Sequence, residues 1–238
     1  MSPIKVGVNG AKGRMGIISI AAVKNAEDME LAFGLDAGDD LGGGIDAFKP
    51  QVVVDFTTPS AVFANTMAII DHGVRPVIGT TGLTEKELGA VRRRLEEKKI
   101  GGIVAPNFSL GALLMMKMAS IGAEHFDSCE IIEQHHARKV DAPSGTARLT
   151  AKIISEGRPK GELSSGSAAS RGGVHEGIRI HSIRLPGRMA HQEVIFGGEG
   201  ETLTIRHDSI SRESFVPGIV QAIRRVLEIE GLEVGLKV

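Results

Sequence analysis

The sequence has no tryptophan, no tyrosine, a single cysteine and no long apolar run. One cysteine, Cys129, cannot form a disulfide within the chain, which argues against a disulfide-stapled secreted domain. We find neither a signal peptide nor a run long enough for a membrane helix. The net charge of -1 offers nucleic acid or membrane no general basic surface. We therefore expect a cytoplasmic protein with no nucleic-acid or membrane partner, in which Cys129 is a small core residue.

What is present is a chain of 238 residues, 42% hydrophobic and with 31 glycines, in which apolar strands first alternate with helices. This alternation is typical of α/β proteins with a parallel sheet. Later the pattern changes to an alternating strand over 177–185 and a hairpin formed by 193–196 and 202–205. The sequence predicts a Rossmann-type parallel sheet domain over 1–107 and 216–238. A second α+β domain with a mixed, largely antiparallel sheet is expected over 108–215.

Several helices carry end signals. Thr84 and Glu87 have capping-box spacing, and Thr58-Pro59 predicts the start of a helix that stops at Gly73. We expect Asp39 and Asp40 to be loop charges. A helix from Leu110 carries a packing stripe of Met115, Met116 and Met118, and the last helix turns Val220, Ile223 and Leu227 inward. The stretch 156–173, rich in Gly, Ser and Pro, predicts a mobile loop, such as a lid or an arm.

A glycine-rich turn follows the first apolar strand, Ile4 to Asn9. Gly10, Gly13 and Gly16 permit a tight turn, close approach of a pyrophosphate and close helix packing, although Lys12 replaces the second glycine of the usual fingerprint. Asp36, 20 residues beyond Gly16, has the spacing of an acceptor for a ribose hydroxyl. A purely structural turn is the alternative for the glycines alone, and Asp36 favours a dinucleotide site.

Further polar segments end the later strands. They are Asp55, 79–82 and 106–109. Because ligands of open parallel sheets bind at the carboxyl ends of strands, these are places where a nicotinamide ring could rest.

The stretch from Glu133 to Ala147 contains several residues suited to proton transfer and anion binding. A strand leads into two histidines, and a helix begins near Ser144, with Ser144 or Thr146 as its N-cap. Backbone N–H groups at Gly145 and Thr146, the helix dipole and Lys139 favour an anion. His135 can transfer a proton near neutral pH, so the natural ligand is a carboxylate substrate. A metal site at the paired histidines and a solvated surface turn are the alternatives.

These features together resemble the 4-hydroxy-tetrahydrodipicolinate reductase family, also called dihydrodipicolinate reductase. The resemblance runs nearly end to end. It rests on V-G-V-N-G-A-K-G-R-M-G (6–16), D-F-T (55–57), G-T-T-G (79–82), P-N-F-S (106–109) and above all E-Q-H-H-A-R-K-V-D-A-P-S-G-T-A (133–147).

The resemblance implies a Rossmann domain closed by the C-terminal helix, and a substrate domain that also builds a homotetramer. It implies reduction of a cyclic, imine-containing dicarboxylate by NADH or NADPH, with loss of water and no metal. His135 would be the proton donor and Lys139 a second acid, with His136, Ser144, Gly145 and Thr146 holding a carboxylate. The cofactor contacts carried over are Gly10, Ala11, Lys12, Gly13, Arg14, Met15, Asp36, Gly79, Thr80, Thr81, Pro106, Asn107, Phe108 and Ser109.

The chain departs from one family pattern, because Ala37 follows Asp36 where some members have an arginine for a 2′-phosphate. The Asp36 charge would repel that phosphate, while Lys12 and Arg14 could offset the repulsion, so we expect dual use leaning to NADH. The segment from Asp36 to Gln51 is brief and leaves the adenine pocket wall undefined.

Two rival functions remain: a non-catalytic NAD-responsive regulator, and a different Rossmann reductase acting on an aldehyde or a hydroxy acid.

Overall fold

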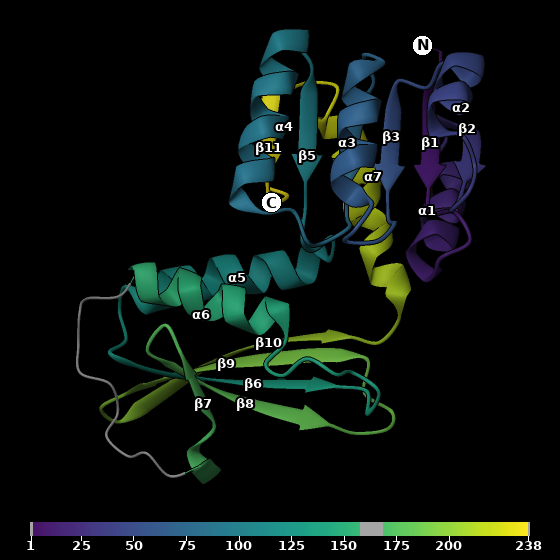
Figure 1. Ribbon diagram of the computed structural model, residues 1–238. Helices are drawn as coiled ribbons and strands as arrows, with labels where there is room; N and C mark the ends of the chain where they lie inside the picture. Colours follow the sequence, from purple (N-terminus) through teal and green to yellow (C-terminus); the bar gives the residue numbers. More distant parts are fainter. Residues whose placement is uncertain (1, 158–168, 238) are drawn as a thin grey trace. The chain divides into compact units, whose positions relative to one another are not determined.

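The computed structural model describes residues 2–157 and 169–237 and divides them into two compact units (Figure 1). The first unit comprises Met1–Leu110 with Arg212–Val238, and the second comprises Gly111–Ser211. The segment 158–168, within the loop expected over 156–173, lies outside the described residues. No helix of the described part is long and apolar enough to cross a membrane. The cytoplasmic location stays a prediction.

The first unit is built on a six-stranded parallel sheet with the order β11-β5-β4-β3-β1-β2. Its strands are β1 (Ile4–Asn9), β2 (Met29–Leu35), β3 (Val52–Asp55), β4 (Arg75–Ile78), β5 (Gly101–Val104) and β11 (Gly231–Val234). Valines 52 to 54 and Ile103 are completely buried, as expected of strands covered on both faces. Because β1 pairs with both β2 and β3, the direction of strand order reverses at β1. The carboxyl ends of β1 and β3 are therefore the expected ligand site.

Helices cover both faces of this sheet (Figure 1). They are α1 (Arg14–Asn25), α2 (Leu41–Phe48), α3 (Val62–Asp71), α4 (Glu85–Lys98) and α7 (Val216–Arg225). α2 packs against α3, α3 packs against α4, and α1 packs against α7. The capping box of α4 is confirmed, since Thr84 and Glu87 exchange hydrogen bonds at its start.

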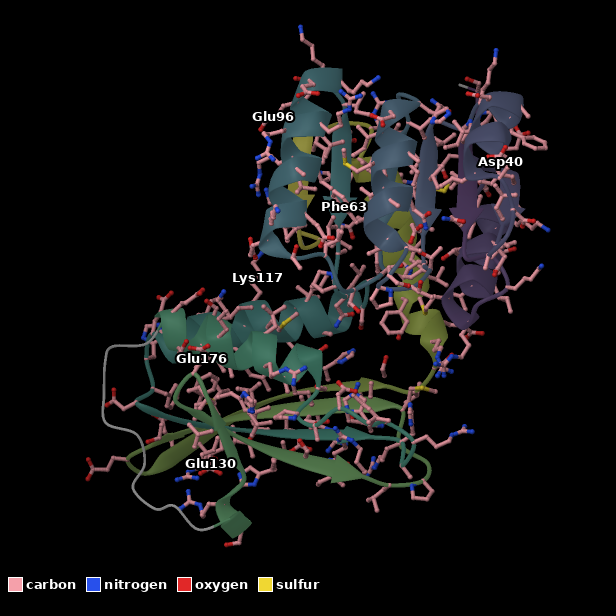
Figure 2. All side chains as sticks on the ribbon, in the orientation of Figure 1. Asp40, Phe63, Glu96, Lys117, Glu130 and Glu176 are labelled. Atoms are coloured by element: carbon pink, nitrogen blue, oxygen red, sulfur yellow. The ribbon has the colours of Figure 1, made fainter. Side chains whose placement is uncertain are left out.

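Three expectations for this unit were wrong in detail, and two elements, α2 and β11, were not predicted. α3 begins at Val62 rather than at Thr58-Pro59, because the Thr58 carbonyl accepts from the Ala61 and Val62 amides in a preceding turn. Asp40 is no loop charge, since its side chain caps the unpredicted helix α2 by accepting from the Gly43 amide (Figure 2). β11 was also not predicted. The buried residues of α7 are Gly218, Ile219, Ala222 and Ile223, so Val220 lies off the buried face.

The second unit has a five-stranded mixed sheet with the order β10-β9-β6-β8-β7. Its elements are α5 (Leu110–Ala123, whose first residue belongs to the first unit), β6 (Ser128–His135), α6 (Gly145–Gly157), η1 (Ala169–Arg171), β7 (Gly173–His175), β8 (Ile178–Arg184), β9 (Ala190–Gly198) and β10 (Glu201–Ser209). β6 and β8 run parallel, and the other neighbours are antiparallel. The expected hairpin is confirmed as β9 and β10.

The core of the second unit lies between one face of its sheet and helices α5 and α6. Met115, Met116 and Cys129 are buried there beside Ile131 and Phe196, which confirms Cys129 as a core residue. Met118 is instead 52% exposed and does not belong to the packing stripe. Because side chains alternate along a strand, Glu133 and His135 share the core-facing side of β6 with Cys129 and Ile131.

Candidate active site

A cavity of about 390 Å³ lies in the first unit where β1 and β3 end. Its lining residues come from the glycine turn, the segments after β2 and β3, and α3. They are Asn9, Gly10, Gly13, Asp36, Ala37, Gly38, Asp39, Leu41, Phe56, Thr57, Thr58, Ala61 and Asn65. Of the residues predicted to bind a cofactor, Gly10, Gly13 and Asp36 line this cavity.

The glycine turn needs glycine for reasons of space and backbone geometry. Gly10 has φ of +82°, and a Cβ there would collide with the Phe56 carbonyl of the neighbouring strand end. A Cβ at Gly16 would likewise collide with the Gly10 carbonyl, so helix α1 could not follow the turn so closely. The amides of Gly10 and Ala11 both donate to the Leu35 carbonyl. The turn is thereby fixed against the end of β2.

Asp36 connects the end of β2 to the same turn. Its carboxylate accepts hydrogen bonds from the Lys12 amide at 2.7 Å and the Ala37 amide at 2.9 Å. These bonds, chiefly that from Lys12, lower the pKa of the exposed Asp36 carboxyl, which is therefore ionised near neutral pH. An anionic acceptor beside glycines that carry no side chain into the cavity fits a ribose hydroxyl next to a pyrophosphate.

Asp55 organises the strand ends at this cavity. Its carboxylate is completely buried and receives hydrogen bonds from neutral donors on four segments. These donors are the Asn9 amide group at 2.8 Å, the Thr57 N–H at 3.1 Å and hydroxyl at 2.8 Å, the Asn65 amide group at 3.1 Å and the Thr80 hydroxyl at 2.8 Å. Asp55 therefore ties the ends of β1, β3 and β4 to α3.

The remaining predicted cofactor residues are distributed around these strand ends. Arg14 and Met15 lie in the first turn of α1, and Gly79 and Thr80 follow β4 directly. The segment 106–109 follows β5, where Phe108 is buried with its ring centroid 5.5 Å from that of Phe56. Asn9, Phe56, Thr57 and Asn65 line the cavity but were not predicted. Asn9 and Thr57 gave a signal, since polar residues at strand ends follow the same rule as Asp55, whereas Phe56 is apolar and Asn65 lies within α3.

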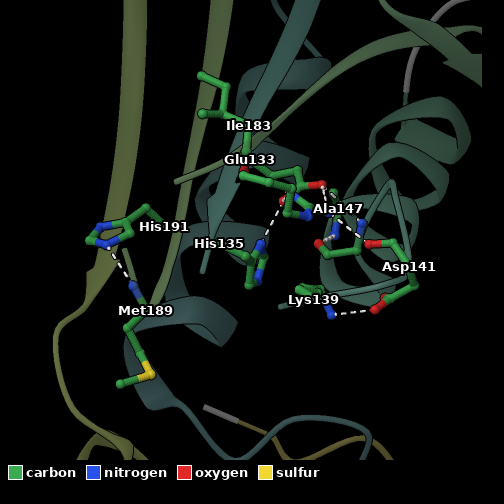
Figure 3. A network of polar contacts seen from close by, with 10 residues as sticks. Glu133, His135, Lys139, Asp141, Ala147, Ile183, Met189 and His191 are labelled. Atoms are coloured by element: carbon green, nitrogen blue, oxygen red, sulfur yellow. Dashed lines mark hydrogen bonds and ion pairs between the residues drawn. The ribbon is translucent and has the colours of Figure 1, made fainter. Parts of the chain in front are cut away.

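The second unit holds its polar centre around Glu133, whose side chain is completely buried (Figure 3). The Glu133 carboxylate lies 2.6 Å from Nδ1 of His135 and accepts from the Ser144 amide at 3.2 Å. Arg184 on β8 donates to both carboxylate oxygens, at 2.9 Å and 2.8 Å. Burial raises the pKa of Glu133, but the hydrogen bonds from His135, Arg184 and Ser182 outweigh it and lower the pKa to about 2.

Lys139 lies in the loop that follows β6. A hydrogen bond from the Lys139 amide to the His136 carbonyl closes a turn, and the Lys139 ammonium pairs with Asp141 at 2.8 Å (Figure 3). Hydrogen bonding to Lys139 lowers the pKa of Asp141. Arg184 also donates to the Asp141 carbonyl at 2.7 Å. One guanidinium thus contacts both the partner of His135 and the loop of Lys139.

The N-terminus of α6 completes this polar centre. Of the two N-cap candidates the structure selects Ser144, whose hydroxyl accepts from the Ala147 amide at 3.1 Å. Ser144 is buried, and both its amide and its hydroxyl are used within the protein. Gly145 is exposed, and a Cβ there would meet nothing within 4 Å. The helix N-terminus therefore opens onto space beside Gly145, where its dipole favours an anion.

Glu133 and Arg184 were missed as functional residues. Alternation along β6 gave a signal for Glu133, because residues two apart share one face. Arg184 gave none, since its proximity depends on the register of β6 with β8, in which it is the direct neighbour of His135. Within the described residues, no group of three or more His, Cys, Asp or Glu could hold a metal ion.

Comparison with known proteins matches both parts of the chain to one family. The family model described as dihydrodipicolinate reductase, N-terminus, matches residues 4–108, and the model for the C-terminus of the same enzyme matches residues 111–236. A 4-hydroxy-tetrahydrodipicolinate reductase of Legionella pneumophila (strain Paris) is 49% identical over 237 residues, covering 98% of each chain. The enzyme of that name from Mycolicibacterium gilvum is 48% identical over 241 residues, again covering 98% of each.

Solved structures agree with this match. A dipicolinate-bound dihydrodipicolinate reductase from Paenisporosarcina sp. TG-14 superposes with a TM-score of 0.89 at 42% identity, covering 98% of each chain. An amine dehydrogenase from Mycobacterium smegmatis gives a TM-score of 0.68 at 12% identity, covering 98% of this chain and 95% of the other. The second likeness concerns the fold alone.

Proposed function

The chain belongs to the dihydrodipicolinate reductase family, and from this we propose that it reduces 4-hydroxy-tetrahydrodipicolinate to tetrahydrodipicolinate in diaminopimelate and lysine biosynthesis. The substrate, a reduced nicotinamide cofactor and one proton give the product, the oxidised cofactor and water. The observation that carries the proposal is the segment 133–147, which supplies an oriented histidine, a lysine ammonium and a helix N-terminus in one unit.

The second unit binds the substrate as a dianion. One carboxylate lies at the N-terminus of α6, beside the Gly145 and Thr146 amides and with His136 as a further contact. Lys139 supplies the full positive charge that a dicarboxylate needs, and in doing so exchanges its partner Asp141 for the substrate. Ser144 caps the helix by accepting from the Ala147 amide, and its hydroxyl hydrogen can still be donated to the carboxylate.

His135 donates the proton that completes the reduction, and Lys139 is the second acid. His135 is only 14% exposed and hydrogen-bonded at Nδ1, so its Nε2 is the nitrogen available to a ligand. Lys139 lies in the same loop and has a flexible stem that can follow the substrate. General acid catalysis of this kind typically contributes about 10²- to 10⁴-fold to the rate.

The first unit binds the cofactor, which supplies a hydride when bound. The cavity beside Gly10, Gly13 and Asp36 accepts the pyrophosphate and adenosine ribose. Further contacts come from Ala11, Lys12, Arg14, Met15, Gly79, Thr80, Thr81, Pro106, Asn107, Phe108 and Ser109. NADH and NADPH are both used, with NADH preferred, because the ionised Asp36 opposes a 2′-phosphate while Lys12 and Arg14 attract it.

The protein assembles as a homotetramer through the sheet of its second unit. Within the described residues, α5 and α6 pack on one face of this sheet, while Ile183 and Leu185 on the other side are 36% and 48% exposed. Exposed apolar side chains on a sheet face are typical of a subunit interface, and the charged cluster of Glu130, His181 and Arg171 lies on the same face. Sedimentation velocity tests the assembly, and a monomer at micromolar concentration would contradict it.

A coupled assay tests the activity. Pyruvate and aspartate semialdehyde are condensed by a separate synthase, and oxidation of NADH is followed. We expect oxidation that requires both precursors and is inhibited by dipicolinate, the ligand named for the Paenisporosarcina enzyme. Binding of NADH without turnover would instead favour a regulator, and turnover of other aldehydes or hydroxy acids alone would favour a different reductase. His135→Gln should lower kcat by about 100-fold or more with little change in NADH affinity.

A further inference from the structure

Strand β6 carries two similar groups of charged residues on its opposite faces. On the side away from α5 and α6, Glu130 accepts from Nε2 of His181 at 2.7 Å and from Arg171 at 2.6 Å (Figure 2). On the side of α5 and α6, Glu133 bonds to His135 and Arg184. Only the second group is built on a completely buried carboxylate, and only the second includes a residue with a proposed catalytic role.

We propose that Glu133 is a positioning residue, which fixes the ring and tautomer of His135 so that Nε2 carries the transferable proton, and that Arg184 anchors Glu133 for this purpose. The inference rests on the proposed function, because it assigns the proton to one nitrogen of the proposed donor. Neither residue needs to touch the substrate. Both act through His135 and through the loop of Lys139.

The tautomer follows from the donors around Glu133. With a pKa of about 2, this carboxyl is ionised at any pH at which activity is measured, and an ionised carboxylate can only accept hydrogen bonds. Nδ1 of His135, 2.6 Å away, must therefore carry the hydrogen. In the neutral ring Nε2 is then the acceptor, and in the imidazolium Nε2–H is the donor that faces a ligand.

Arg184 is suited to this task by its geometry. Its two terminal nitrogens reach both oxygens of Glu133, and one of them also reaches the Asp141 carbonyl. A lysine in this place would keep the charge but lose the paired contact, since only a guanidinium presents two parallel N–H groups. The side chain of Asp141 in turn holds Lys139. Arg184 therefore couples the orientation of the histidine to the position of the lysine.

The pH dependence of turnover depends on the charges that face His135. They come from Glu133 on β6, from Arg184 on β8, and from the loop after β6, which carries His136, Lys139 and Asp141. On α6, Arg148 acts on Asp141. Removing the Glu133 charge leaves the imidazolium with cationic neighbours and without its direct partner. We therefore expect the pH above which turnover declines to be lower in a variant without this charge.

The kinetic test compares Glu133→Gln with Glu130→Gln, a change of the same kind on the opposite face of the same strand. In Glu133→Gln the new amide must turn its oxygen to Arg184 and its NH₂ to His135, which forces the other tautomer. We expect kcat to fall about 100-fold or more, the high-pH limb of the kcat profile to move to lower pH, and the Kd for NADH to stay within about threefold. Glu130→Gln should keep the kcat and pH profile of the wild type. Because Glu130 lies on the sheet face proposed as the subunit interface, sedimentation velocity checks that this variant also keeps the wild-type assembly.

Arg184→Lys is the second variant and should give a smaller fall in kcat together with a raised KM, because it loosens both His135 and the Lys139 loop. If Glu133→Gln folds and keeps the kcat and pH profile of the wild type, the inference is overturned while the proposed function stands. If the wild type itself shows no turnover in the coupled assay, the proposed function fails instead.

A spectroscopic measurement tests the tautomer in the wild-type protein and does not require Glu133→Gln or Arg184→Lys to fold or to be active. In ¹⁵N-labelled wild-type protein, long-range proton–nitrogen correlations distinguish the two neutral tautomers of each histidine, and His135→Gln assigns the signal by its loss. We expect the Nδ1–H form for the neutral ring of His135, observed at alkaline pH. An Nε2–H form would overturn the inference independently of the kinetics.

Discussion

The carboxylate of Asp36 accepts a 2.7 Å hydrogen bond from the backbone amide of Lys12, which is 24 positions earlier in the sequence. The bond joins the end of β2 to the glycine turn, so the acidic residue and the turn form one surface of the cavity. The other carboxylate oxygen accepts from the Ala37 amide. The charge of Asp36 is therefore held in place by backbone groups rather than by a cation.

Asp36→Ala should shift cofactor preference towards NADPH. Removing the fixed negative charge removes repulsion of a 2′-phosphate and also removes the acceptor for a ribose hydroxyl. We expect the ratio of kcat/KM for NADPH to that for NADH to rise about tenfold or more, as measured by steady-state kinetics. Losing the bond to Lys12 affects the binding of both cofactors alike. The ratio of the two kcat/KM values separates this effect from that of the charge. Ala37→Arg should move the ratio in the same direction; an unchanged ratio in both variants would contradict the assignment.

Lys139→Ala should weaken the binding of dicarboxylates and slow turnover as well. The ammonium is expected to meet the substrate charge and to act as the second acid, so KM should rise and kcat should fall, each by about tenfold or more. Calorimetric titration with dipicolinate measures the binding part alone. Lys152→Ala is the matched control, because Lys152 lies exposed on α6 and pairs only weakly with Glu156 at 3.9 Å. Equal effects of the two substitutions would refute the role of Lys139.

Much of the first unit was predictable because its strands are short apolar runs that end in glycine or polar residues. Helix α2 was not, since three of its first four residues are glycines, which have poor helix propensity. It forms because Asp40 caps it and Ile45 is buried against Phe33 and Val74. The four-residue strand β11 was missed for a similar reason, as it forms by pairing with β5 rather than by any pattern of its own.

The candidate site shows the same limit. His135, Lys139 and the start of α6 could be predicted because they lie within one segment with recognisable chemistry. Glu133 could also have been predicted, since it is two residues from His135 on a strand. Arg184 could not have been predicted, because it is 51 positions from Glu133 in the sequence and only the strand register brings the two together. Register follows from packing and turns rather than from the residues at the site.

Thr84→Ala should lower the stability of the first unit without changing the activity. The Thr84 hydroxyl accepts from the Glu87 amide, while the Glu87 carboxylate accepts from the Thr84 amide at 2.8 Å. Loss of an N-cap typically costs about 1 kcal/mol. Thermal unfolding should show a lower midpoint for Thr84→Ala and for Glu87→Ala, and the double variant should lose less than the two changes summed. Additive losses would show that the two side chains do not act together.

The stability of the second unit should fall in acid through Glu133. Its pKa in the folded protein is about 2, below the ordinary 4.5, so its ionised form stabilises the fold fully above about pH 4.5 and this contribution is lost as the pH falls towards 2. The shift corresponds to on the order of 3 kcal/mol. Urea unfolding followed from about pH 6 down to about pH 2.5, where most of this loss falls, should show a steeper decline for the wild type than for Glu133→Gln.

Glu130→Gln is the control for this acid titration and should keep most of the wild-type slope. The Glu130 side chain is 35% exposed, and its pKa is held down by partly solvated contacts with His181 and Arg171. Solvent screening therefore leaves its carboxylate a smaller share of the stability than the buried carboxylate of Glu133. Parallel curves for the wild type and Glu133→Gln would mean that Glu133 is not held ionised by His135 and Arg184.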